Sequence, residues 1–221
     1  MGNKKKKIAI ITARGGSKRI KNKNLINFYG KPLISYSIEV AKKTNIFHKI
    51  YVTTDSSKIK QVAEYYGATV PYLRSKKLSN DFIGTREVVV DFLKKMKLFE
   101  NDICCIYPTA PMMRPSDLLN SYKQLPRQHY IFSSNETLQK KGKIFSINKK
   151  NIITKFIKHK TKKKRYMDAG QFYWGTANTW LNKKNIVAVG SMIKKIPKKY
   201  AHDLNSPADL KILKMKFKKI R

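Results

Sequence analysis

The chain has 221 residues, of which 41% are hydrophobic, so we expect one domain with an ample core spanning residues 1–221. No apolar run approaches the roughly 20 residues of a membrane span, and no signal-peptide apolar region follows the lysines before Ile8, so membrane insertion is not expected. The two cysteines, Cys104 and Cys105, are adjacent and cannot form an ordinary disulfide framework. We therefore expect a cytoplasmic protein with reduced thiols.

The net charge is +36, from 49 Lys and Arg against 13 Asp and Glu. A field of this strength attracts polyanions such as nucleic acid, so non-specific polyanion binding is one interpretation. The basic residues are mostly Lys, however, and they are spread from end to end among many Ile, Asn, Tyr and Phe residues. That pattern is typical of an AT-rich coding sequence, and we favour compositional drift over a functional polyanion site.

The first expected element is a strand over Ile8 to Ala13, an apolar, β-branched run of the kind buried on both faces of a sheet. It breaks abruptly into a loop in which Gly15 and Gly16 allow backbone N–H groups to approach an oxyanion and Ser17 adds a hydroxyl donor. The loop and its continuation also carry the cations Arg14, Lys18, Arg19 and Lys23. This pattern predicts a nucleoside triphosphate site at the carboxyl edge of an α/β sheet. The alternative is a basic surface turn, since neither a Walker A nor a GxGxxG pattern is present.

The next segments alternate between helix and strand. A turn at Asn27 to Gly30 precedes a helix over Leu33 to Lys43, whose apolar residues recur at helical spacing. The later expected elements are a strand over Lys49 to Thr54, a helix over Ser57 to Tyr66 capped by Asp55-Ser56, and a short strand over Thr69 to Leu73. Capping is the safer role for Asp55, although it could instead touch a nucleotide. The alternation predicts the doubly wound half-fold that carries mononucleotides.

The middle of the chain continues this pattern. A loop over Arg74 to Thr85 leads into a helix over Arg86 to Lys97, with Thr85 as its expected cap. A strand over Asp102 to Tyr107 then ends in a loop, Pro108 to Arg114, which we expect at the same sheet edge as the basic loop. A helix starting at Pro115 and a strand over Tyr130 to Ser134 follow.

The last third departs from the alternation. Residues 140–165 predict a small β excursion, with hairpin strands at Lys143 to Ile147 and Asn151 to Ile157. Strands are expected again at Gln171 to Trp174 and at Ile186 to Val189. In Phe172, Tyr173 and Trp174 we expect at least two core residues. Ser206-Pro-Ala-Asp209 predicts the start of a C-terminal helix, with Ser at the N-cap and Pro at the first helical position. Together the elements indicate a Rossmann-like three-layer α/β/α fold with a mostly parallel sheet.

Several motifs in order along the chain resemble those of the cytidylyltransferases that activate nonulosonic (sialic-type) acids. These motifs are Ala13 to Arg19 with Lys23-Asn24, Thr53 to Asp55, Leu73-Arg74, Pro108 to Pro111 and Asp168 to Trp174. The last of them, with Asn80 to Thr85 and Cys104 to Tyr107, resembles the bacterial pseudaminic acid cytidylyltransferases in particular. The resemblance implies a nucleotide-diphospho-sugar transferase fold, a homodimer and a reaction in which CTP and the sugar acid give the CMP-sugar and pyrophosphate with Mg²⁺.

The resemblance also implies roles for individual residues. The catalytic residues would be Arg14, Lys18, Lys23 and Asp203, with Asp203 and Asn205 at the metal. The nucleotide would be bound by Ala13, Gly15, Gly16, Ser17, Asn24, Arg74, Thr85, Pro108 and Thr109. The sugar would be bound by Asp168, Gln171 and Tyr173.

Two departures from the family pattern affect these expectations. The family's metal pair is Asp-x-Asp, whereas this chain has Asp203-Leu204-Asn205, so one carboxylate is missing and metal affinity should fall. The family has an Arg-Ser-Gln-Asp-like segment where this chain has Lys158 to Thr161, and in the family that segment belongs to the sugar side of the pocket or to the dimer contact. Two alternatives stay open: a different sialic-type substrate such as sialic or legionaminic acid, and a catalytically impaired, polyanion-binding homologue.

Overall fold

The computed structural model describes residues 5–139, 142–157, 164–202 and 204–220. The helices in this part of the chain are α1 (Leu33–Lys43), α2 (Ser57–Tyr65), α3 (Thr85–Lys95), α4 (Pro115–Lys123), α5 (Ala177–Asn182) and α6 (Pro207–Ile220), with short 3-10 turns η1 (Lys23–Leu25) and η2 (Lys76–Leu78). The strands are β1 (Lys7–Thr12), β2 (Asn27–Phe28), β3 (Lys31–Pro32), β4 (Lys49–Thr53), β5 (Asp102–Ile106), β6 (Ile131–Glu136), β7 (Phe145–Ile147), β8 (Ile153–Phe156), β9 (Tyr166–Thr176) and β10 (Met192–Lys195).

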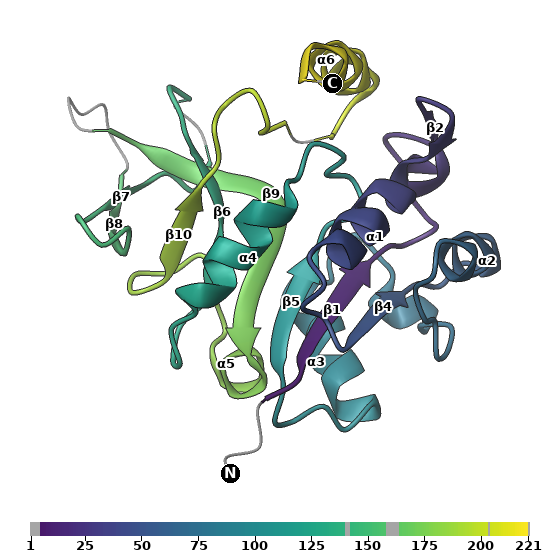
Figure 1. The fold of residues 1–221 in the computed structure, drawn as a ribbon, viewed down its shortest axis with the longest axis horizontal. Helices are drawn as coiled ribbons and strands as arrows, with labels where there is room; N and C mark the ends of the chain where they lie inside the picture. The colour runs from purple at the N-terminus through teal and green to yellow at the C-terminus, as the bar shows by residue number, and fades with distance from the viewer. Residues whose placement is uncertain (1–4, 140–141, 158–163, 203, 221) are drawn as a thin grey trace.

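The central sheet confirms the expected fold class. Its main order is β10-β6-β9-β5-β1-β4, and β7 and β8 extend from β9. β1 pairs in parallel with β4 and β5, and β10 pairs in parallel with β6. The long strand β9 runs antiparallel to both β5 and β6 and joins the two parallel parts (Figure 1). The chain leaves β1 for β4 on one side and returns to β5 on the other, so a topological switch point lies between β1 and β5.

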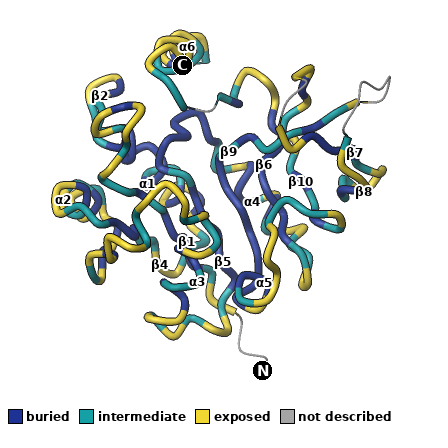
Figure 2. The backbone as a smooth tube through the Cα atoms, turned by 180° about the vertical axis from the view of Figure 1, so that it is seen from behind, coloured by how far each residue is buried: buried dark blue, intermediate teal, exposed yellow. Residues whose placement is uncertain are grey.

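Two hydrophobic clusters cover the two faces of the sheet, which gives the three layers. Alternate residues of β1 point to opposite faces, with Ala9 and Ile11 in one cluster and Ile8 and Ile10 in the other. The first cluster packs against α1, α2 and α4, and the second against α3 and α5. The strands in the middle of the molecule are accordingly almost entirely buried (Figure 2). Phe172, Tyr173 and Trp174 are all buried, as expected for core residues of β9.

The C-terminal helix α6 lies beyond the carboxyl ends of β1 and β5, away from the N-terminus (Figure 1). It is attached by a third, smaller cluster in which Leu213 and Phe217 pack with Phe28, Leu33 and Tyr36. The rings of Phe28 and Phe217 meet edge to face with centroids 5.0 Å apart. The expected start at Ser206 is confirmed, because the Asp209 N–H donates to Ser206 Oγ (3.2 Å) and the helix begins at Pro207.

The expected strand over Thr69 to Leu73 is wrong. This segment makes only isolated parallel bridges, Tyr51 with Thr69 and Thr54 with Leu73. Pro71 lies between the two bridges and has no N–H to donate, so the ladder cannot continue across it.

The expected strand over Ile186 to Val189 is also wrong. Ser191 folds back on this segment, since its N–H donates to the Ala188 carbonyl (3.1 Å) and its hydroxyl to the Ile186 carbonyl (2.9 Å). The strand β10 begins only after this turn, at Met192. The sequence analysis also missed α5, a six-residue helix capped by the hydroxyl of Thr176 at the end of β9.

The described part of the β excursion is the antiparallel hairpin β7–β8, which joins the main sheet through Phe145 and Tyr166. No helix among the described residues is long and apolar enough to cross a membrane.

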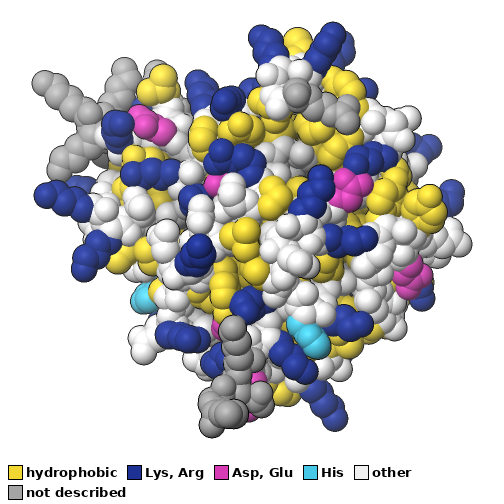
Figure 3. All heavy atoms as spheres, viewed as in Figure 1, with side chains coloured by type: hydrophobic (Ala, Val, Ile, Leu, Met, Phe, Trp, Pro, Cys, Tyr) yellow, Lys and Arg dark blue, Asp and Glu magenta, His cyan; other side chains and the backbone are white. Residues whose placement is uncertain are grey.

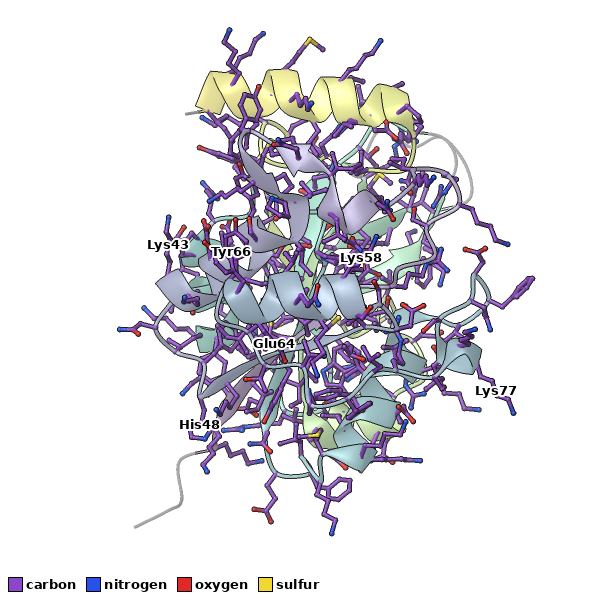
Figure 4. The ribbon with its side chains drawn as sticks, turned by 90° about the vertical axis from the view of Figure 1, so that its right-hand side faces the viewer. Lys43, His48, Lys58, Glu64, Tyr66 and Lys77 are labelled. Atoms are coloured by element: carbon purple, nitrogen blue, oxygen red, sulfur yellow. The ribbon has the colours of Figure 1, made fainter. Side chains whose placement is uncertain are left out.

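Lys and Arg side chains are scattered over the face shown in Figure 3, with few acidic side chains between them. Figure 4 shows the side that carries α2, where the exposed Lys77 projects away from the body of the molecule.

Candidate nucleotide site

A cavity of about 310 Å³ opens at the switch point, beyond the carboxyl ends of β1 and β5. This is the position at which open α/β sheets bind their ligands. Residues that follow β1 supply cations, and residues of α3 and of the segment after β5 also line the cavity. The lining residues are Thr12, Arg14, Arg19, Lys23, Asn24, Arg74, Leu78, Asn80, Asp81, Ile83, Gly84, Thr85, Val88, Tyr107, Pro108, Thr109 and Asn205.

Most of the residues singled out in the sequence for nucleotide chemistry meet in this cavity. Those that line it are Arg14, Lys23, Asn24, Arg74, Thr85, Pro108, Thr109 and Asn205. Ala13, Gly15, Gly16, Ser17 and Lys18 lie in the adjoining strand end and loop and are not among its lining residues. Ala13 is fully buried in the core on one face of the sheet.

The glycine loop is held by an acidic side chain that the sequence analysis assigned to a helix cap. The Gly15 N–H donates to Asp55 Oδ1 (2.7 Å), whereas Ser56 alone caps α2 by accepting from the Ile59 N–H (3.4 Å). The capping role of Asp55 is therefore wrong. Its position after β4 places its carboxylate beside the loop that follows β1, since these parallel strands are neighbours.

Two buried residues of the cavity present polar atoms that have no hydrogen-bond partner among the described residues. Asn24 is 4% exposed; its Nδ2 donates to the Arg14 carbonyl (2.9 Å), while its Oδ1 is unpaired. Arg74 is 5% exposed; its Nε donates to Ser79 Oγ (3.0 Å), while one of its terminal nitrogens is unpaired. Burial lowers the pKa of the Arg74 guanidinium from its ordinary value, and nearby Asp55 opposes that shift. Unpaired buried polar atoms are costly, so both residues favour a polar ligand in this cavity.

Asp81 balances part of the positive charge. Its carboxylate forms ion pairs with Arg14 and, at 3.1 Å, with Lys18. Hydrogen bonds from Arg14 and Lys18 lower the pKa of the Asp81 carboxyl, which is therefore ionised at neutral pH. The sequence analysis quoted the Asn80 to Thr85 motif but gave Asp81 no role.

Thr85 has a different local role from the one expected. Gly84 occupies the N-cap of α3 and Thr85 is the first helical residue, so the capping prediction is wrong. The Thr85 hydroxyl instead lies 2.7 Å from the Tyr107 hydroxyl. Tyr107 follows β5, and burial raises the pKa of its hydroxyl to about 12, so it is a neutral hydrogen-bonding group. Tyr107 is a second lining residue that the sequence analysis did not assign.

The three residues expected to bind sugar all lie on β9. Asp168 lines a larger cavity of about 830 Å³ at the ends of β6, β9 and β10, next to α6. Four lysines line the same cavity: Lys164, Lys195, Lys198 and Lys216. Tyr173 is buried and donates to Asp168 Oδ2 (2.7 Å). Gln171 is 2% exposed and donates through Nε2 to the Tyr200 carbonyl (2.7 Å), while its Oε1 has no partner in the described structure.

The expected metal pair is only half described. Asp203 lies outside the described residues, as does the Lys158 to Thr161 segment, whereas Asn205 lines the cationic cavity. Next to it, Lys23 Nζ donates to the Leu204 carbonyl (3.0 Å). Within the described ranges, no group of three or more His, Cys, Asp or Glu side chains could hold a metal ion.

An open sheet with a cationic cavity at its switch point and unpaired polar atoms inside it defines a nucleotide-binding α/β protein. A solved structure supports the fold: a CMP:2-keto-3-deoxy-manno-octonic acid synthetase complexed with CTP matches with a TM-score of 0.78 at 16% identity, covering 98% of this chain and 100% of that one.

Sequence comparison defines the family. A cytidylyltransferase family model matches residues 8–217, and the chain belongs to this family. A pseudaminic acid cytidylyltransferase of Campylobacter jejuni is 35% identical, over 96% of this chain and 97% of that protein. A CMP-N,N'-diacetyllegionaminic acid synthase of Legionella pneumophila is 40% identical over 50% of this chain and 49% of that protein.

Proposed function

We propose that the protein transfers CMP from CTP to a nonulosonic acid, with pseudaminic acid as the first candidate, and releases pyrophosphate. The observation that carries the proposal is the pair of unpaired atoms, Asn24 Oδ1 and a terminal nitrogen of Arg74, inside the cationic cavity. The relative from Campylobacter jejuni, which matches this chain nearly end to end, is named for pseudaminic acid and supports the choice of sugar.

The cavity suits a nucleoside triphosphate in one orientation. Arg14, Arg19 and Lys23 lie at the end reached by the loop after β1, so the triphosphate belongs there. The base belongs at the other end, between Arg74, Thr85 and Tyr107. The sugar hydroxyl attacks the α-phosphorus while the bond to pyrophosphate breaks. The cations offset the charge on the departing pyrophosphate, because fixed charge in a partly dry site stabilises such a transition state.

The larger cavity is the proposed place of the sugar acid. Its lysines attract a carboxylate, and Asp168 can accept hydrogen bonds from sugar hydroxyl or amide groups. Ala201 and His202 line the larger cavity and Asn205 lines the smaller one, so described residues that lie close together in the sequence reach both cavities. Mg²⁺ would be held by Asp203, the Asn205 amide oxygen and phosphate oxygens, which are the hard ligands it prefers, and it would supply charge stabilisation at the phosphates.

Replacement of Lys23 tests the triphosphate end of the site. We expect Lys23→Ala to lower kcat/KM for CTP by about a hundredfold or more, because a charge at the departing pyrophosphate is lost. Lys21→Ala is the matched control, since Lys21 is an exposed lysine of the same segment outside the cavity. Circular dichroism should be unchanged in both variants. Full activity of Lys23→Ala would remove Lys23 from the proposed mechanism.

The substrate is tested by pyrophosphate release from CTP with a panel of pseudaminic, legionaminic and sialic acids. We expect the highest kcat/KM with pseudaminic acid. A preference for another acid would keep the reaction and replace the sugar, whereas no release with any acid would reject the proposed function.

A further inference from the structure

Asp81 is the only acidic residue among the described residues that line the nucleotide cavity. Its two carboxylate oxygens face different cations: Oδ1 accepts from the Arg14 guanidinium, and Oδ2 lies 3.1 Å from Lys18 Nζ. Both cations belong to the segment that follows β1, whereas Asp81 belongs to the loop before α3. The loop before α3 is therefore joined to the segment that supplies cations for a triphosphate.

The Asp81 carboxylate binds these cations in the way that a phosphate group would. Guanidinium and ammonium groups bind carboxylate and phosphate oxygens through the same charge-assisted hydrogen bonds. Two anions cannot occupy the same place, and they repel each other when they are close together. A phosphate group that reached Arg14 and Lys18 would therefore have to displace Asp81 from them.

The segment around Asp81 can move aside without breaking other long-range hydrogen bonds. Asn80 Oδ1 accepts from the Phe82 N–H (2.9 Å) and the Ile83 N–H (3.1 Å), and Asn80 Nδ2 donates to a carbonyl three residues earlier (2.8 Å). In the described structure, no hydrogen bond other than those of Asp81 joins residues 80–83 to another part of the molecule. The side chain of Phe82 is 96% exposed, so it does not anchor the segment either.

The two ion pairs are exposed enough for a highly charged ligand to replace them. The Lys18 side chain is 84% exposed, and that of Asp81 is 39% exposed. Ion pairs between exposed side chains are weak, because water and salt screen them. A triphosphate carries several negative charges and can pair with more cations than one carboxylate can, so it should win this competition.

We propose that Asp81 occupies Arg14 and Lys18 in the empty site, is displaced by the β- and γ-phosphates of CTP, and returns as pyrophosphate leaves. The inference rests on the proposed function, which places the triphosphate at this end of the cavity. Asp81 is then a specificity-determining residue that opposes ligands with a pyrophosphate group and does not oppose CMP, whose one phosphate group lies next to the ribose. Its return to the two cations favours the release of pyrophosphate, a product of the reaction.

The test is calorimetric titration of CTP, pyrophosphate and CMP into the wild-type protein and into Asp81→Asn. The buffer contains no Mg²⁺, so that a metal ion cannot link a carboxylate to the phosphates. We expect Asp81→Asn to bind CTP and pyrophosphate about fivefold more tightly than wild type, because two exposed ion pairs no longer oppose binding. The affinity for CMP should change by less than about twofold.

Glu87→Gln is the matched control. Glu87 is an exposed acid on α3, next to the lining residue Val88, and its carboxylate is not the one paired with Arg14 and Lys18. The substitution removes the same charge from the neighbourhood of the cavity. It should change the affinity for each of the three ligands by less than about twofold, because only long-range electrostatics is altered.

Unchanged, weaker or undetectable binding of pyrophosphate by Asp81→Asn would overturn the inference. An equal gain for CMP, or an equal gain in Glu87→Gln, would also overturn it, because the effect would then come from net charge and not from competition for the two cations. If the protein bound pyrophosphate with the expected dependence on Asp81 but bound neither CTP nor CMP, the proposed function would fail and the displacement of Asp81 would stand.

Discussion

Gly15 and Gly16 are neighbours in the basic loop, but only one of them lies against another segment. A Cβ atom on Gly15 would lie 2.9 Å from Ser56 Cβ, beside the carboxylate that accepts from the Gly15 N–H. A Cβ atom on Gly16 would meet nothing within 4 Å. The loop after β1 and the start of α2 are thus packed together at Gly15, so this contact helps to position the loop.

We expect Gly15→Ala to lower the free energy of unfolding by about 1–3 kcal/mol, as overpacking does, and to raise KM for CTP because the loop moves away from α2. Gly16→Ala should remain close to wild type in both measurements. Urea denaturation and CTP kinetics check the pair. Equal behaviour of the two variants would show that the contact with Ser56 does not position the loop.

Asn205 occupies a position where a second carboxylate would strengthen a cation site. The expected result of Asn205→Asp is a lower Mg²⁺ concentration at half-maximal rate, because the charge of the ligands tunes affinity for hard cations. Asn151→Asp, at the turn before β8, controls for added negative charge elsewhere. If neither Asn205→Asp nor Asp203→Asn alters the Mg²⁺ dependence, the metal does not bind at this pair.

The sequence predicts which residues gather at the site better than it predicts their partners. Asn24 and Arg74 belong to recognisable motifs, and both line the cavity. The partner of Asp55 could not be predicted, because a carboxylate after a strand can cap the next helix or reach a loop on the neighbouring strand. Only the register of β1 against β4 decides between these, and it places Asp55 at the Gly15 N–H.

At the scale of elements, the prediction succeeds where the hydrophobic period is unbroken. The helix over Leu33 to Lys43 is predicted with its observed bounds, because apolar residues recur along one face and a proline precedes it. The segments Thr69 to Leu73 and Ile186 to Val189 have the composition of strands but do not form the backbone hydrogen bonds of a strand. A local feature prevents strand formation in each: Pro71 has no N–H to donate in the first, and Ser191 folds back on the second.

The start of α6 depends on a carboxylate. Asp209 Oδ2 accepts from the Asn205 N–H (3.0 Å), the Ser206 N–H (2.7 Å) and the Ser206 hydroxyl (2.9 Å). Burial opposes its ionisation, but these hydrogen bonds outweigh burial and lower the pKa of Asp209 from its ordinary value. This arrangement resembles a capping box and also positions Asn205 at the edge of the cavity.

We expect Asp209→Asn to lower the free energy of unfolding by about 0.5–1 kcal/mol at pH 7, the usual range for a lost cap. Because the pKa is lower in the folded state, the stabilisation is complete above the unfolded-state pKa of about 3.9 and is lost as the pH falls through the folded-state pKa. The difference between wild type and variant should therefore shrink below about pH 4. Urea denaturation from pH 8 to pH 3, with Asp91→Asn on α3 as the control, tests it. A difference that grew as the pH fell below about 4 would contradict the assignment.

At the scale of the whole molecule, the positive charge is spread over the surface and is not concentrated on one face. Lysines are present on every described helix except the short α5, and the face in Figure 3 shows them interspersed rather than gathered in a single patch. Such a surface attracts polyanions through long-range electrostatics, which salt screens. The cavity differs from this surface because Arg74 is almost fully buried there.

Salt dependence separates the two interpretations of the +36 charge. If the charge is compositional, binding to duplex DNA should fall by about a thousandfold or more between about 50 and 200 mM salt, as it does for contacts made only with phosphates. The KM for CTP should change by less than about tenfold over the same range, because CTP carries few charges and a buried arginine is screened less than exposed lysines. Fluorescence anisotropy with labelled DNA and the pyrophosphate release assay measure the two quantities in the same buffers. DNA binding that stayed nanomolar at physiological salt, in a protein that released no pyrophosphate from CTP, would instead indicate a polyanion-binding homologue on a cytidylyltransferase scaffold.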